Sequence, residues 1–100
     1  MNISKTEEQN KVTLSIEGWL DVTTTPDLHA YLETLPETQE LYFDFKDLEY
    51  ISSAGVREVV AAYRKQKEIK GEFAVINVSA DVYDVFDMTG LTKKLDIREA

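Results

Sequence analysis

Apolar and polar residues alternate near the start of the chain. Between Lys11 and Gly18 every second residue is apolar, which is the period of a strand with one buried face. A weaker pattern of the same kind covers Ile3 to Thr6, and a polar stretch separates the two segments. We therefore expect the chain to begin with a β-hairpin.

Three later segments have the three- and four-residue apolar spacing of amphipathic helices. They cover residues 26–35, about 53–70 and 80–89. Thr25 and Ser79 are the expected N-caps of the first and third helices, because their hydroxyls can accept hydrogen bonds from free N–H groups. Gly71 is the expected residue just after the second helix. On the third helix we expect Met88 to face the core.

Strand patterns separate these helices. They cover Glu40–Phe45, Glu72–Val78 and Leu95–Arg98. Phe73–Ile76 is almost continuously apolar, which indicates a strand in a parallel sheet with both faces buried. The predicted order is ββαβαβαβ, a single α/β domain over residues 1–100 with a mixed sheet and helices packed against it.

Composition narrows the possible functions. The chain has 100 residues, no cysteine and a net charge of −8, so disulfides, thiol catalysis and thiolate metal sites are excluded. Phosphate backbones repel an acidic chain, so we expect no nucleic-acid partner. The acidity provides solubility or complements a basic surface on a partner protein. With no membrane-length apolar run and no secretory signal, we expect a cytoplasmic protein without membrane insertion.

No catalytic motif is present. The sequence lacks a phosphate-binding loop, a GxGxxG motif and a GxSxG elbow, and its one histidine, His29, is out of phase with the leucines of its helix. We therefore expect His29 to be exposed, and we expect no enzyme activity, no metal and no cofactor. Asp21, Asp44 and Asp47 either converge near the serines described next or are ordinary surface carboxylates.

Two serines mark a predicted strand-to-helix junction, within Tyr50–Val56. A helix N-terminus has unpaired N–H groups and the positive end of the helix dipole. Ser52 or Ser53 can therefore cap the second helix, and either can also be modified from outside. The residues alone leave both roles open.

Several short motifs, in this order and at this spacing, resemble the STAS family, which includes antagonists of anti-sigma factors and cytoplasmic domains of sulfate transporters. The similarity covers nearly the whole chain, although many members have a further helix beyond the position of Ala100. The motifs are Gly18–Asp21, Phe43–Leu48, Ile51–Gly55, Ile76–Ser79 and Phe86–Leu91.

In bacterial antagonists of this family, the anti-sigma factor is a serine kinase that phosphorylates a serine at the start of the second helix. Unphosphorylated antagonist binds the kinase, and a serine phosphatase reverses the modification. Alignment on Gly55 makes Ser53 the equivalent serine. Ser52 stands where the family often has aspartate, and Ala54 where it often has serine. The alternative is an unphosphorylated STAS subunit that binds a transporter ATPase or a signalling scaffold.

The resemblance implies a partner-binding surface around Ser53. Arg57, one helical turn further on, can approach a phosphate there, and Gly55 can leave room for a partner's backbone. Asp21 is expected to lie close to Ser53, because both residues follow strands that should be neighbours. The predicted binding residues are Trp19, Asp21, Ser52, Ser53, Gly55, Val56 and Arg57.

Overall fold

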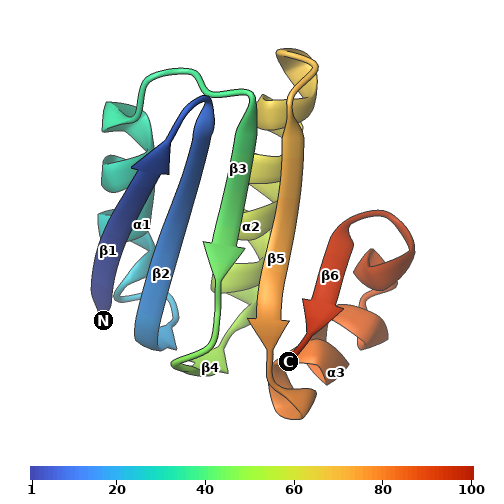
Figure 1. The fold of residues 1–100 in the computed structure, drawn as a ribbon. Helices are drawn as coiled ribbons and strands as arrows, with labels where there is room; N and C mark the ends of the chain where they lie inside the picture. The colour runs from blue at the N-terminus through green and yellow to red at the C-terminus, as the bar shows by residue number, and fades with distance from the viewer.

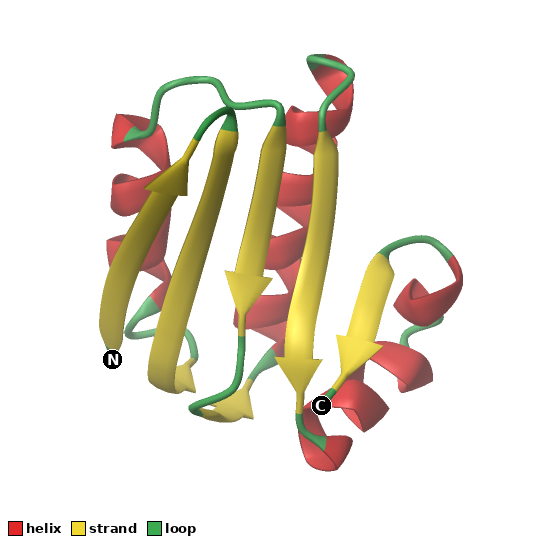
Figure 2. Cartoon of the chain, in the orientation of Figure 1, coloured by secondary structure: helices red, strands yellow, loops and turns green.

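A single mixed sheet carries all three α-helices on one face (Figures 1 and 2). The computed structural model describes residues 1–100. The elements are β1 (Asn2–Glu8), β2 (Lys11–Leu20), α1 (Thr25–Thr34), β3 (Glu40–Asp44), β4 (Leu48–Ile51), α2 (Ser53–Glu68), β5 (Glu72–Val78), α3 (Ala80–Met88), the 3-10 turn η1 (Leu91–Lys93) and β6 (Asp96–Glu99).

The strands lie in the order β1-β2-β3-β5-β6, and β4 pairs with the end of β2. Only β1 is antiparallel to its neighbour; the other pairs are parallel. The hairpin, the mixed sheet and the alternation of helix and strand confirm the predicted fold class. The short strand β4 is an addition to the predicted order.

The core lies between the sheet and the helices. Leu14, Phe43, Val75 and Ile97 are register partners across four strands, so they point to the same face. On that face Phe45 stacks on Phe86 of α3, with ring centroids 6.5 Å apart. The opposite face of the sheet has no helix over it (Figures 1 and 2). The predicted burial of β5 on both faces is nevertheless confirmed for Phe73, Ala74 and Val75, at 9%, 1% and 0% exposed, whereas Ile76 is half-buried.

Three details at helix ends correct the sequence prediction. The N-cap of α1 is Thr24, one residue earlier than predicted. The left-handed residue after α2 is Lys70, with φ of 58°, and not Gly71. Gly71 is needed for space, since a Cβ there would lie 2.4 Å from Nε2 of Gln66. Met88 is 86% exposed and does not face the core, whereas Ser79 caps α3 as predicted.

Candidate functional site

The candidate site lies where β2 and β4 end side by side, at the lower edge of the sheet in Figure 1. Leu20 and Ile51 are register partners, and the N–H of Ser52 donates to the Leu20 carbonyl at 2.9 Å. Asp21 and Ser53 therefore each follow a paired strand end. This arrangement supports the predicted proximity of the two residues.

The two serines at the start of α2 have different surroundings. Ser52 is the N-cap: its Oγ accepts from the N–H of Gly55 at 3.4 Å, and its carbonyl accepts from Val56 at 2.9 Å. Ser53 is the first residue of the helix, is exposed, and its hydroxyl has no hydrogen-bond partner within the protein. The capping role therefore belongs to Ser52, and the hydroxyl of Ser53 is accessible.

Gly55 and Val56 are buried beneath this surface. A Cβ at Gly55 would lie 2.7 Å from Cγ1 of Ile51 and 2.8 Å from the carbonyl oxygen of Leu20. Val56 is 7% exposed and belongs to the hydrophobic core. The prediction that Gly55 leaves room for a partner's backbone is therefore corrected, because residues of the same chain occupy that space.

The carboxylate of Asp21 organises the turn that leads into α1. It accepts hydrogen bonds from the Thr23 hydroxyl at 2.7 Å, the Thr23 N–H at 2.9 Å and the Thr24 N–H at 3.2 Å. These bonds, led by the one from the Thr23 hydroxyl, hold the pKa of Asp21 below its ordinary value. Asp21 is thus a charged carboxylate that shapes the loop beside the serines.

Two aromatic rings lie on the surface just before the serines. Trp19 and Tyr50 are register partners of β2 and β4, with ring centroids 5.1 Å apart and planes at 44°. They remain 55% and 45% exposed. Trp19 is one of the predicted site residues, whereas Tyr50 is an addition that depends on the strand β4.

Arg57 completes the polar side of the site. It is exposed, lies one turn after Ser53 on α2, and forms no ion pair. Asp44 is directed elsewhere, since it accepts from Nδ2 of Asn77 and the N–H of Lys46, both at 3.0 Å. The structure holds no group of acidic or histidine side chains arranged for a metal ion.

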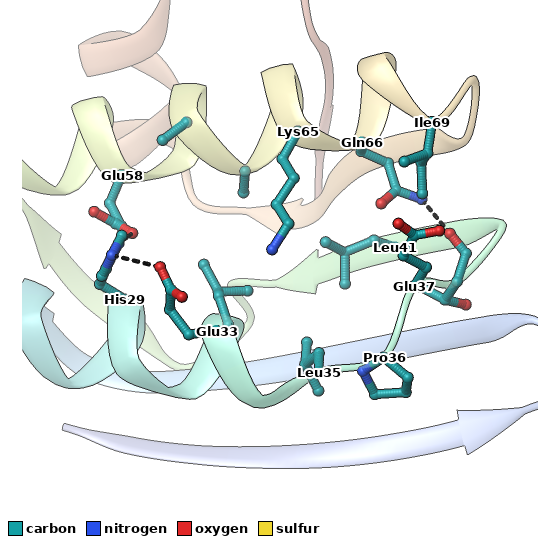
Figure 3. Close-up of a pocket in the computed structure, with 14 residues that line it drawn as sticks. His29, Glu33, Leu35, Pro36, Glu37, Leu41, Glu58, Lys65, Gln66 and Ile69 are labelled. Atoms are coloured by element: carbon teal, nitrogen blue, oxygen red, sulfur yellow. Dashed lines mark hydrogen bonds and ion pairs between the residues drawn. The ribbon is translucent and has the colours of Figure 1, made fainter.

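A second candidate site is a pocket of about 110 Å³ between α1 and α2 (Figure 3). His29 closes one end through Nδ1 to Glu58 at 2.8 Å and Nε2 to Glu33 at 3.0 Å. The hydrogen bond to Glu58 is the main cause of a raised His29 pKa. At the other end, buried Gln66 donates to the Thr38 carbonyl at 2.7 Å. His29 is exposed, as predicted, and its contact with Glu58 joins the two helices.

Comparison with known proteins gives a family and a fold. The STAS domain family model matches residues 2–100. The anti-sigma-B factor antagonist of Bacillus subtilis is 30% identical over 98 residues, which are 97% of this chain and 90% of that protein.

The solved structures of SpoIIAA have the same fold as this chain. The unphosphorylated anti-sigma factor antagonist SpoIIAA has a TM-score of 0.82 at 21% identity, covering 96% of this chain and 87% of that one. The phosphorylated form of Bacillus SpoIIAA has a TM-score of 0.76 at 20% identity, covering 96% and 90%. None of the helices of this chain is long and apolar enough to cross a membrane.

Proposed function

Since this chain belongs to the STAS domain family, we propose that it is an anti-sigma factor antagonist whose binding to an anti-sigma factor kinase is switched off by phosphorylation of Ser53. A serine phosphatase would restore the binding form. The antagonist binds and is modified, and it performs no chemistry itself. The proposal rests on one observation above all: a serine with a free, exposed hydroxyl at the first position of α2, in a chain similar along its length to an anti-sigma-B factor antagonist.

The first turn of α2 suits a phosphate. The N–H groups of Ser53 and Ala54 precede the intrahelical hydrogen bonds, and the helix dipole favours negative charge at this end. Arg57, one turn further on, adds a cation without a partner. Because Ser52 provides the cap, phosphorylation of Ser53 leaves the cap hydrogen bond intact.

The switch would act through charge and volume. A phosphoserine carries about −1.5 to −2 charges, and a partner surface that covers it must remove its water. Arg57 offsets one of these charges at most, and desolvation of the remaining charge costs several kcal/mol, which is enough to convert a micromolar complex into one barely formed. SpoIIAA has been solved in both unphosphorylated and phosphorylated forms, and both resemble this chain, which supports a switch without rearrangement of the fold.

The test is a phosphorylation assay with adjacent serines as matched variants. The chain is used to capture its kinase from the native cytosol, and the purified kinase is then incubated with ATP and wild type, Ser53→Ala or Ser52→Ala. We expect intact mass to show one phosphate on the wild type and on Ser52→Ala, and none on Ser53→Ala. Ser53→Ala should bind the kinase whether or not ATP is present.

Two results would contradict the proposal. Phosphate on Ser53→Ala at the wild-type rate would place the modification elsewhere. Capture of a transporter ATPase or a signalling scaffold, with no phosphate on any serine, would favour the alternative of an unphosphorylated STAS subunit. NMR spectra add a check on mechanism, because shifts confined to residues near Ser53 and Trp19 are expected, and changes across β5 would indicate a conformational switch instead.

A further inference from the structure

Exposed apolar side chains gather beside the candidate site. Five large apolar residues of this chain are exposed, and three of them lie on β2, β4 or the turn after β2: Trp19, Val22 and Tyr50, at 55%, 72% and 45%. Single exposed apolar residues are ordinary, whereas an exposed apolar cluster indicates an interaction surface. Tyr50 is also only three residues before Ser53, so this cluster and the modified serine share one end of the molecule.

The fold orients the aromatic pair (Trp19 and Tyr50) outward. Their neighbours Leu20 and Ile51 are buried at 0% and 3% exposed, and successive side chains of a strand point to opposite faces. Parallel pairing of β2 and β4 then brings the two rings into contact at 5.1 Å. Each ring fixes the other, which lowers the entropy that a partner must remove on binding.

Carboxylates lie on the same two strands and the turn before β4. Glu17, Asp47 and Glu49, here called the acidic rim, line one shallow depression together with Gly18 and Met1. None of the three forms an ion pair within the protein. Asp21, on the other side of Trp19, is also charged and bonded only to neutral groups. The α-amino group of Met1 lines the same depression and offsets one of these charges, so the carboxylates leave a negative excess next to the two strands that carry the rings.

We propose that the aromatic pair is the anchor for the anti-sigma factor kinase, and that it receives an arginine-bearing basic strip whose other cations face the acidic rim and leave none to pair with a phosphate at Ser53. A guanidinium group stacks on aromatic rings and pairs with carboxylates, and buried aromatic and arginine residues supply much of the energy of protein interfaces. This inference rests on the proposed function and adds the chemistry of the partner surface. The same anchor would hold the kinase beside Ser53 for phosphoryl transfer.

The binding arm compares Trp19→Ala and Tyr50→Ala with Met88→Ala, the matched control. Met88 is 86% exposed and belongs to α3, so its loss removes an exposed apolar side chain outside the cluster. With the purified kinase we expect each ring variant to bind on the order of 30-fold more weakly, the loss typical of an interface hot spot. Met88→Ala should bind as the wild type does. For phosphorylation, the ring variants should raise KM and leave kcat unchanged, because the anchor contributes equally to the bound ground state and the transition state.

Charge reversal keeps the rings in place. Glu49→Lys should also weaken binding, and added salt should weaken wild-type binding more than it weakens that of Glu49→Lys. Circular dichroism of every variant checks that the fold is retained. If Glu49→Lys binds the kinase with wild-type affinity, the partner does not present a basic strip to the acidic rim.

A second experiment needs no partner protein. Trp19 is the only tryptophan, so its fluorescence reports on the aromatic pair alone. Caesium should quench it more strongly than iodide in the wild type, and this difference should become smaller when Glu17, Asp47 and Glu49 are changed together to glutamine or asparagine. Equal quenching by both ions in the wild type would show that the potential near Trp19 is not negative.

The two hypotheses can fail separately. Normal wild-type binding and phosphorylation, with unchanged affinity in both ring variants, would overturn the anchor alone. A wild type that the kinase neither binds nor phosphorylates would overturn the proposed function, and the anchor with it.

Discussion

A methyl group added at Gly55 tests whether this glycine serves the fold or a partner. In Gly55→Ala, the new Cβ would lie 2.7 Å from Cγ1 of Ile51, 2.8 Å from the Leu20 carbonyl oxygen and 3.0 Å from Cγ of Leu20. Ordinary carbon contacts are about 3.5–4.0 Å long. The side chain of Ile51 can shift by rotation, but the Leu20 carbonyl belongs to the backbone of β2.

The expected cost follows from two opposing terms. Alanine is favoured over glycine in a helix by about 0.8–1.0 kcal/mol. Overpacking in a dense core costs about 1–3 kcal/mol, and the upper part of that range applies here, because the Leu20 carbonyl also accepts the 2.9 Å bond from Ser52. We therefore expect Gly55→Ala to lower the free energy of unfolding by about 1–2 kcal/mol, from a 2–3 kcal/mol clash offset by the propensity gain.

Urea unfolding followed by circular dichroism measures this change, with an unchanged m-value as evidence that the transition is the same. Ala61→Gly is the matched control, since Ala61 is exposed on the same helix and reports the propensity term without a clash. If Gly55→Ala is as stable as the wild type or more stable, the steric reasoning is wrong. If such a variant also fails to bind its kinase, Gly55 serves a partner after all.

Four further variants test other parts of the structure. Ser52→Ala should lower the free energy of unfolding by about 0.5–2 kcal/mol and Ser53→Ala by much less, since Ser52 provides the cap; equal losses in urea unfolding would contradict this assignment. His29 has a raised pKa in the folded state, so its stabilising effect is complete below about pH 6.5 and is lost as the pH rises through the folded pKa. His29→Gln should remove this loss of stability with rising pH, as measured by thermal unfolding. An unchanged pH profile would show that the ion pairs of His29 do not contribute to stability. Gln66→Ala leaves the Thr38 carbonyl without its 2.7 Å partner and should cost about 1–3 kcal/mol in the same urea assay, whereas wild-type stability would mean that water replaces the bond.

Much of the fold could be predicted because its patterns are local. The alternation in β2, the three amphipathic helices and the cap at Ser79 each depend on neighbouring residues, and each prediction is confirmed. The strand β4 escaped prediction because its four residues are buried only at both ends, which is not the alternation of a strand. Its partner is the distant end of β2, and no local pattern specifies that pairing.

In the candidate site, too, the features that depend on local sequence could be predicted and those that depend on long-range contacts could not. The position of the serines after a strand and before a helix could be predicted, but two adjacent serines fit the cap equally well in sequence, and only the 3.4 Å contact to Gly55 distinguishes them. Gly55 itself was misinterpreted, because what fills its space comes from β2 and β4. Tyr50 was missed for the same reason: its contact with Trp19 depends on long-range pairing.

The pairing of β2 with β4 also bears on when the site exists. Leu20 and Ile51 come from opposite sides of α1 and β3 in the chain, so the backbone bond from Ser52 to Leu20 closes the loop that contains both elements. Closing that loop has an entropic cost, which the packing of the folded chain must offset. A partner that contacts both strand ends at once would therefore bind the folded molecule and not a nascent or partly unfolded one. Recognition of this site would thus select chains whose folding is complete.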